Sequence, residues 1–340
     1  MKRHLVVLTY LILILINIKP AESKFIKRGQ VGFRFLENPV SAEAIGRGGL
    51  GIVTIQNANA VFWNPSGIGW IDGRFDFCAN YTRSIADINY SSLAGAVNLG
   101  NYGIIALDYL GMDYGDFTGT RRANNAQGFE YTGTFSPNAY SFGLTYSQKV
   151  SDRFSYGVRG KYAVQNLGSV WVGLEGSDVD DTSLVMGKKS YSLSEPAIDI
   201  GATYDFLSHG LRFGAVMQNF SRELRYEREK FPMPFSVSFS LSAKPLLFVT
   251  SDKIANDLTI GFETCHPRDF KEKIKFGAEY FYDNILIVRT GYMGNYDERG
   301  LTLGLGVRKS YLNMNLRIDY SFQDFGVFNS VHTFSFGVSQ

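Results

Sequence analysis

Near its C-terminus the chain reads Leu301-Thr302-Leu303-Gly304-Leu305-Gly306-Val307-Arg308, with a large apolar residue at every second position. The positions between them hold threonine, glycine and one charge. A period of two places these two sets on opposite faces of a β-strand. Residues 312–320 repeat the pattern, with Leu, Met, Ile and Tyr on one face and Asn, Arg and Asp on the other. The two segments predict neighbouring strands, each with one apolar and one polar face.

The same alternation recurs through most of the chain, for example in residues 198–204 and 258–263. The polar faces repeatedly hold Gly, Ser, Thr and Asn with single charges of both signs. A lipid-facing wall around a polar lumen has this composition, with aromatic residues at the strand ends. We therefore expect an all-β fold, a transmembrane antiparallel β-barrel of about 14 strands. The expected strands begin near Gly73, Asp87, Tyr102, Asn138, Arg153, Glu195, Leu211, Phe231, Asp257, Glu272, Ile285, Leu301, Tyr311 and Val327.

Composition and charge agree with an ordered, strand-rich chain. The 340 residues include 20 Tyr, 27 Phe and 36 Gly, whereas only 19% are charged. A formal net charge of +2 gives no basic excess for neutralising phosphates, so we expect no nucleic-acid partner.

Residues 1–23 have the pattern of a secretory signal peptide. Lys2 and Arg3 precede an apolar run over residues 5–18, and Ala21-Glu22-Ser23 supplies a cleavage site. As a membrane anchor the apolar run would be short, because a spanning helix needs about 20 residues. We expect export to the bacterial outer membrane, with residues 24–72 as an N-terminal plug or periplasmic segment and residues 73–340 as the barrel.

The lengths of the connections support the barrel. Most connections at one end are tight, and the two longest, residues 115–137 and 166–194, follow the third and fifth expected strands. Outer-membrane barrels have short periplasmic turns and long external loops. Two connections depart from this rule. The connection after the first expected strand, residues 85–86, is short, and the one after the eighth, residues 244–256, is long.

Two motifs lie before the first expected strand: Gly46-Arg47-Gly48-Gly49-Leu50-Gly51 and Asn64-Pro65-Ser66-Gly67. Here the chain resembles the PorV/PorQ family of the FadL-like barrel superfamily, whose members carry similar elements ending in an NPAG core at this place. Ser66 replaces the alanine of that core. The resemblance extends to the C-terminal third and implies plug residues that we list here: Gly46, Gly48, Gly49, Asn64, Pro65 and Gly67.

The first motif also fits G-x-G-x-x-G, a dinucleotide-binding pattern. That function needs a parallel strand before the motif and a helix after it, and neither is indicated. Tight turns in a packed plug explain the glycines better. We expect no cofactor.

Charged residues on the polar faces are the second set of candidates. The structural interpretation is a network of ion pairs that fills the lumen and fixes the strand register; the functional one is a ligand path. We favour the structural interpretation. The set comprises Asp108, Arg159, Asp199, Glu263, Glu279, Arg289, Arg317 and Asp319.

Catalytic patterns are not evident in the sequence. We find no nucleophile elbow, no Ser-His-Asp order and no carboxylate pair that suggests a glycosidase, and His209, His266 and His332 have no second metal ligand at a suitable spacing. We expect a non-enzymatic protein without a metal site.

Two functions remain open. The resemblance to PorV/PorQ implies an outer-membrane component of type IX protein secretion that binds or anchors cargo, with membrane lipid, secreted cargo proteins and secretion machinery as partners. The alternative is a FadL-type channel for hydrophobic small molecules or fatty acids. Such a channel needs an apolar internal pocket. The inner faces read as polar, so we favour the secretion role and expect the two longest loops to contact partners.

Overall fold

The computed structural model describes residues 31–123, 125–173, 186–226, 228–248 and 257–340. The predicted signal peptide, residues 1–23, lies outside the described residues. No helix in the described ranges is long and apolar enough to cross a membrane.

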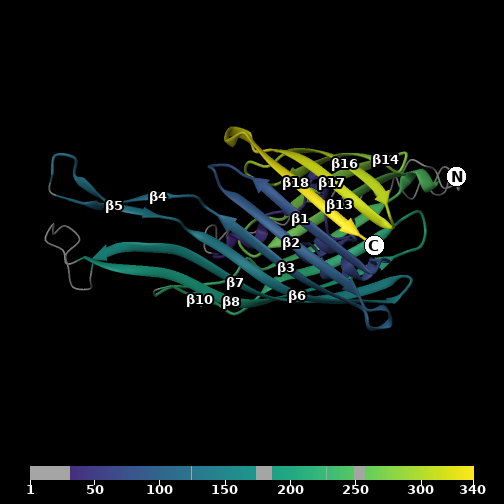
Figure 1. Cartoon of the computed structure of the whole chain (residues 1–340), viewed down its shortest axis with the longest axis horizontal. Coiled ribbons are helices and arrows are strands. Elements are labelled where there is room, and N and C mark those ends of the chain that lie inside the picture. The colour runs from purple at the N-terminus through teal and green to yellow at the C-terminus, as the bar shows by residue number, and fades with distance from the viewer. Residues whose placement is uncertain (1–30, 124, 174–185, 227, 249–256) are drawn as a thin grey trace.

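The fold is a closed antiparallel barrel of fourteen strands, as predicted (Figure 1). The strands run in chain order around the wall, and β1 pairs with β18 to close it. The barrel strands are β1 Phe75–Arg83, β2 Asn89–Asn98, β3 Ile104–Asp113, β6 Asn138–Ser151, β7 Phe154–Gly173, β8 Met186–Asp205, β9 Arg212–Phe220, β12 Ser236–Ala243, β13 Asp257–Pro267, β14 Lys273–Tyr282, β15 Leu286–Gly294, β16 Leu301–Tyr311, β17 Met314–Asp324 and β18 Ser330–Ser339.

The predicted faces are confirmed in β16. Leu301, Leu303 and Leu305 expose 46–53% of their surface on the outside, whereas Thr302 between them is fully buried. Large apolar side chains on the other strands are exposed in the same way. A wall of this kind is stable only in contact with lipid, because water would meet a continuous apolar surface.

The two longest predicted loops are wrong in part, because both contain strands. Residues 115–137 include a separate hairpin, β4 Phe117–Arg122 and β5 Phe129–Phe135. Within residues 166–194, β7 and β8 continue their pairing as far as Gly173 and Met186. A bulge between Asn166 and Gly168, where Gly168 has φ 89°, lets the ladder continue. Both hairpins project from the barrel at the end opposite the C-terminus, which we call the loop end (Figure 1).

The expected start of the eighth strand near Phe231 is also wrong. Phe231 belongs to a short hairpin, β10 Leu224–Arg225 and β11 Lys230–Phe231, and β12 begins only at Ser236. Pro232 and Pro234 explain the delay, because proline has no N–H to donate to the ladder.

Residues 31–72 lie inside the barrel and are called the plug below (Figure 1). Their elements are short: η1 Arg34–Glu37, α2 Ala42–Gly46, η2 Ala58–Phe62 and η3 Pro65–Trp70. The remaining short helices, η4 Gly100–Tyr102, η5 Pro245–Phe248 and η6 Gly326–Phe328, connect barrel strands. Phe33, Phe35, Ile45 and Leu50 of the plug are almost fully buried. The apolar core of this protein therefore forms between the plug and the inner wall.

Candidate functional site: the plug and the luminal cavity

Asn64 to Gly67 fix the C-terminal half of the plug to the wall formed by β7 and β8. The Asn64 side chain caps η3: its Oδ1 accepts from Ser66 N at 3.1 Å, and its Nδ2 donates to Ile52 O at 3.1 Å. Ser155 on β7 donates to Ser66 O at 3.0 Å. Pro65 occupies the first turn of η3, where its missing N–H leaves no bond unmade.

Glycines on the wall make room for this turn. A Cβ added to Gly157 would lie 2.4 Å from the Pro65 carbonyl carbon, and one added to Gly201 would lie 1.9 Å from Asn64 Oδ1. Within the plug, a Cβ on Gly67 would meet Ile55 O at 2.7 Å. The plug backbone therefore lies directly on the strand backbone.

The glycine-rich motif packs on the opposite side of the barrel. Gly48 and Gly49 both have φ 74°, a region that favours glycine. Gly48 N donates to Thr302 Oγ1 at 2.9 Å, and Thr302 Oγ1 donates to Gly46 O at 3.2 Å. The motif follows α2, a helix of five residues, and contacts antiparallel strands rather than a βαβ unit. This arrangement supports the plug interpretation over dinucleotide binding.

The inner wall beneath the motif is a glycine platform, formed by Gly277, Gly291 and Gly304 on β14, β15 and β16. A Cβ on Gly277 would lie 2.1 Å from Arg47 O, and one on Gly291 would lie 2.2 Å from Gly48 N.

The predicted lumen charges all have oppositely charged partners, and they fall into separate groups. On one side Arg159 pairs with Asp108 and, at 3.1 Å, with Asp199, which also pairs with Lys161 at 2.7 Å. All four side chains are nearly fully buried. Asn219 N donates to Asp199 at 2.7 Å, so this group also holds the bulge between β8 and β9.

The second group connects the plug to the barrel. Arg289 bonds Glu279 at 2.5 Å and Asp319 at 2.7 Å, and Arg47 of the plug reaches Glu279 at 3.1 Å. Arg47 also pairs with Glu43 at 3.3 Å. Burial alone would raise the pKa of Glu43, but the charges of Arg47 and other arginines outweigh it and lower this pKa to about 2.

The two remaining predicted charges form smaller pairs: Glu263 with Lys275 at 2.6 Å, and Arg317 with Asp76 at 2.7 Å. The partners Lys161 and Lys275 were not predicted. Lys161 lies two residues from Arg159 and Lys275 lies four residues from Glu279, so strand parity could have indicated both.

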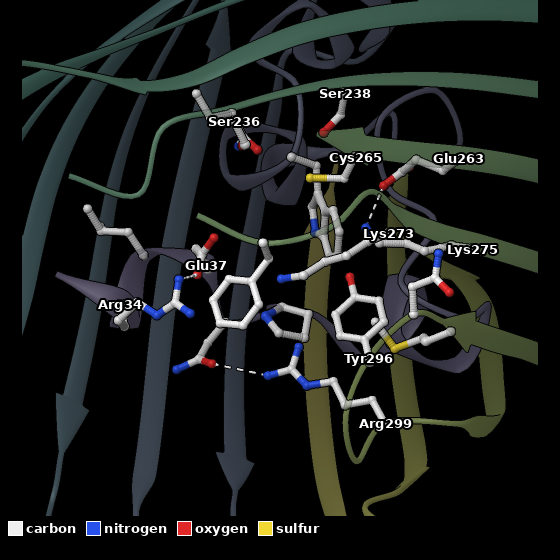
Figure 2. A pocket seen from close by; sticks show the side chains of 18 of the residues that line it. Arg34, Glu37, Ser236, Ser238, Glu263, Cys265, Lys273, Lys275, Tyr296 and Arg299 are labelled. Atoms are coloured by element: carbon white, nitrogen blue, oxygen red, sulfur yellow. Dashed lines mark hydrogen bonds and ion pairs between the residues drawn. The ribbon is translucent and has the colours of Figure 1, made fainter. Parts of the chain in front are cut away.

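The open space in the lumen is a cavity of about 370 Å³ at the loop end, between the plug and strands β12–β15. We call it the luminal cavity; Figure 2 shows it. Its apolar wall comes mainly from the plug: Leu36, Val40, Ile52, Phe62 and Trp63, with Met293 of β15. Its charged wall includes Lys273, Tyr296 and Arg299, which sequence reasoning missed, because the loop holding the last two shows no periodic pattern.

The apolar wall continues into a larger apolar cluster. Leu36, Val40 and Phe62 also pack with Phe33 and Phe35 of the plug. On the barrel side this cluster contains the inward-facing residues Tyr90, Leu110, Ala139, Ala163 and Ala197. The expectation that the lumen has only polar faces is therefore wrong, because the plug supplies apolar surface that the strand pattern does not report.

No known family profile matches the sequence, and no curated protein matches it. Solved structures do match. The Pseudomonas putida toluene transporter TodX aligns with a TM-score of 0.58 at 12% identity, over 88% of this chain and 96% of that one. The Ralstonia pickettii toluene transporter TbuX aligns with a TM-score of 0.53 at 13% identity, over 91% and 98%. A Pseudomonas aeruginosa FadL homologue gives 0.54 at 12% identity, over 88% and 98%.

These likenesses concern the fold. None of the matches supports the specific resemblance to PorV/PorQ that the motifs suggested, whereas the fold expected from the broader FadL-like resemblance is confirmed. The chain has the fold of the FadL-like outer-membrane channels.

Proposed function

We propose that this protein is a non-enzymatic outer-membrane channel that admits small hydrophobic molecules. The observation that carries the proposal is the luminal cavity, whose apolar wall lies inside the barrel beside the ion pairs of the inner wall. A buried apolar surface at this position favours apolar ligands over polar solutes. The toluene transporters with the same fold give independent support.

The packing of the plug restricts the route. Its backbone rests on glycines of β7, β8, β14 and β15 and is tied to the wall by Arg47, Asn64 and Ser66. Expelling the whole plug would break these contacts together. We infer that ligands enter through the luminal cavity beside a plug that stays docked.

One observation supports the secretion role. The projecting hairpins expose Tyr131 and Trp171 by 70% and 42%, and such side chains commonly anchor a protein partner. Other aromatic residues of the two loops make ring contacts: Phe135 stacks on Phe117 within one hairpin, and Tyr191 of β8 meets Tyr226, which follows β10. Removal of residues 116–136 should abolish binding of secreted proteins if this role is correct, and should leave uptake of hydrophobic molecules unchanged.

Uptake of radiolabelled toluene by intact cells that lack other FadL-like channels tests the proposal. Two neighbouring residues of β12 supply matched variants: Ser238 faces the luminal cavity, and Phe239 is 46% exposed on the outer wall. Ser238→Trp fills the cavity, so uptake should fall to that of cells without the protein. Phe239→Trp should transport as the unmodified protein does. Equal uptake with and without the barrel would refute the proposal, and so would equal uptake by the two variants at equal surface levels.

A further inference from the structure

The luminal cavity has a charged wall opposite its apolar wall. Lys273 stands at the start of β14, and Tyr296 and Arg299 lie in the connection between β15 and β16. Figure 2 shows these three side chains extending into the cavity. They come from neighbouring parts of the loop end, so one ligand can contact all of them.

Aromatic rings hold the two cations in place. Lys273 Nζ lies 4.9 Å from the centre of the Tyr296 ring and 5.1 Å from that of Phe270. Arg299 Cζ lies 5.7 Å from the centre of the same Tyr296 ring and 5.2 Å from that of Phe325. Cation–π contacts of this kind orient a cation but do not neutralise it.

Neither cation forms an ion pair within the described ranges. The nitrogen of Lys273 makes no hydrogen bond there, and Arg299 donates only to Asn38 Oδ1, at 3.3 Å. The charge that acts most strongly on Lys273 is that of Glu37, which attracts it without forming an ion pair, and Arg299 acts on Lys273 as a like charge. Two cations that face each other in a partly buried cavity repel, and a bound anion would relieve that repulsion.

Two of the other carboxyl groups that line the cavity are paired with cations. Glu37 bonds Arg34 at 2.6 Å, and Glu263 bonds Lys275 at 2.6 Å. Burial raises the pKa of Glu37, although Lys273 and Arg34 oppose the shift, so this carboxyl resists ionisation. Asp297 and Glu298 also line the cavity; Asp297 has its own interaction partner, whereas Glu298 forms no ion pair within the described ranges.

Tyr296 adds a hydrogen-bond donor. Burial raises the pKa of Tyr296, so its phenol stays neutral and can donate to an anion. Its hydroxyl makes no hydrogen bond to another described residue. An ammonium, a guanidinium and a phenol therefore converge without a bound acceptor, which is the donor set that a carboxylate needs.

The apolar wall determines the shape of the ligand's apolar part. Val40, Phe62 and Trp63 present a short surface with two aromatic rings, in a volume of about 370 Å³. A flat ring packs well between aromatic side chains and needs no long groove.

We propose that the luminal cavity binds monocyclic aromatic carboxylates, with the carboxylate held by Lys273, Arg299 and Tyr296 and the ring against Phe62 and Trp63. This inference rests on the proposed channel function and names a second substrate class for the same cavity. A neutral hydrocarbon uses only the apolar wall.

Equilibrium dialysis of the detergent-purified protein with radiolabelled benzoate tests this. Lys273→Gln and Arg299→Gln each remove one charge-assisted contact, and the benzoate Kd should rise roughly tenfold or more in each. Tyr296→Phe should weaken benzoate by a smaller factor. Lys309→Gln, on the exposed surface of β16, should leave the Kd unchanged.

Further ligands separate the parts of the proposal. Hexanoate should bind more weakly than benzoate, and chloride should not displace benzoate at matched ionic strength. Toluene uptake in cells should be unaffected by Lys273→Gln, because no charge is involved. If toluene enters but benzoate does not bind, or binds both glutamine variants as tightly as the unmodified protein, the proposed carboxylate site is wrong. If benzoate binds as described but toluene uptake is absent, the site stands and the channel function for neutral molecules fails.

Discussion

Gly291→Val should release the glycine-rich half of the plug from the barrel wall. Gly291 lies on the glycine platform, and a Cβ there would lie 2.2 Å from Gly48 N and 2.4 Å from the Arg47 carbonyl carbon. Both neighbours are backbone atoms, so no side chain can rotate away. The plug cannot slide along the wall either, since the platform glycines on both sides also touch it: a Cβ would lie 2.1 Å from Arg47 O at Gly277 and 2.9 Å from Gly46 Cα at Gly304.

The cost can be worked from these contacts. Overpacking of a tight site costs about 1–3 kcal/mol. Lifting the segment also breaks the bond from Gly48 N to Thr302 Oγ1 and the pair of Arg47 with Glu279, at about 1 kcal/mol each. We expect local docking of residues 46–49 to weaken by about 3 kcal/mol, which is roughly a 100-fold rise in the open population.

Limited trypsin digestion in detergent measures this population at Arg47, which is only 3% exposed when the plug is docked. Cleavage at Arg47, normalised to cleavage at Arg121 in the projecting hairpin, should be roughly 100-fold faster in the valine variant. Gly160→Val is the matched control, because a Cβ on this outward-facing glycine of β7 meets no atom within 4 Å. Equal protection of Arg47 in both variants would show that the close packing of the platform does not hold the plug.

Three further outcomes are expected. Leu305→Arg places a charge on the lipid face, which should destabilise the inserted barrel by about 2–4 kcal/mol and reduce the folded protein in the outer membrane. Ser238→Arg places the charge in the lumen, and this variant should accumulate normally. Equal loss of both variants from membrane fractions would mean that the faces are misassigned. Asp199→Ala leaves Arg159 and Lys161 without a shared carboxylate and should lower the free energy of unfolding by about 3–5 kcal/mol, seen as a lower unfolding temperature on heated gels. Asp152→Ala is the control, because this side chain is 88% exposed, and should not change the unfolding temperature. An unchanged transition for Asp199→Ala would contradict the buried network. Because the folded pKa of Glu43 is lowered from 4.5 to about 2, its stabilisation of the plug is present above pH 4.5 and is lost as the pH falls toward 2; amide exchange of residues 42–49, corrected for the intrinsic rate, should show protection lost over this window, and constant protection down to pH 2 would refute it.

The barrel could be predicted because the polarity of each strand residue matches the medium that its side chain faces. Leu303 and Leu305 face lipid and Thr302 faces the lumen, so the alternation of apolar and polar residues in the sequence follows the two faces of the wall. The charges Arg159 and Asp199 were recognised for the same reason. Their contacts could not be predicted, since Asp108 lies 51 residues and Asp199 lies 40 residues from Arg159 in the sequence.

The hairpin extension and the luminal cavity escaped sequence reasoning for different reasons. The ladder of β7 and β8 continues through a bulge at Gly168, which interrupts the period of two, so the sequence pattern predicts the end of a strand there. The cavity joins Leu36 and Phe62 of the plug to Lys273 and Arg299 of the wall, and no local pattern connects residues so far apart. The motif around Asn64 indicated a plug, but only the structure shows that this plug brings apolar surface into the lumen.

The central claim, that an apolar molecule occupies the luminal cavity beside a docked plug, is tested most directly by diffraction from crystals soaked in bromobenzene. Anomalous scattering locates the bromine without assumptions about the ligand pose. We expect a bromine peak inside the barrel, against Val40, Phe62 and Trp63, with Arg47 and Asn64 still in contact with the wall. Bromine peaks confined to the lipid-facing surface, with the cavity free of them, would contradict it.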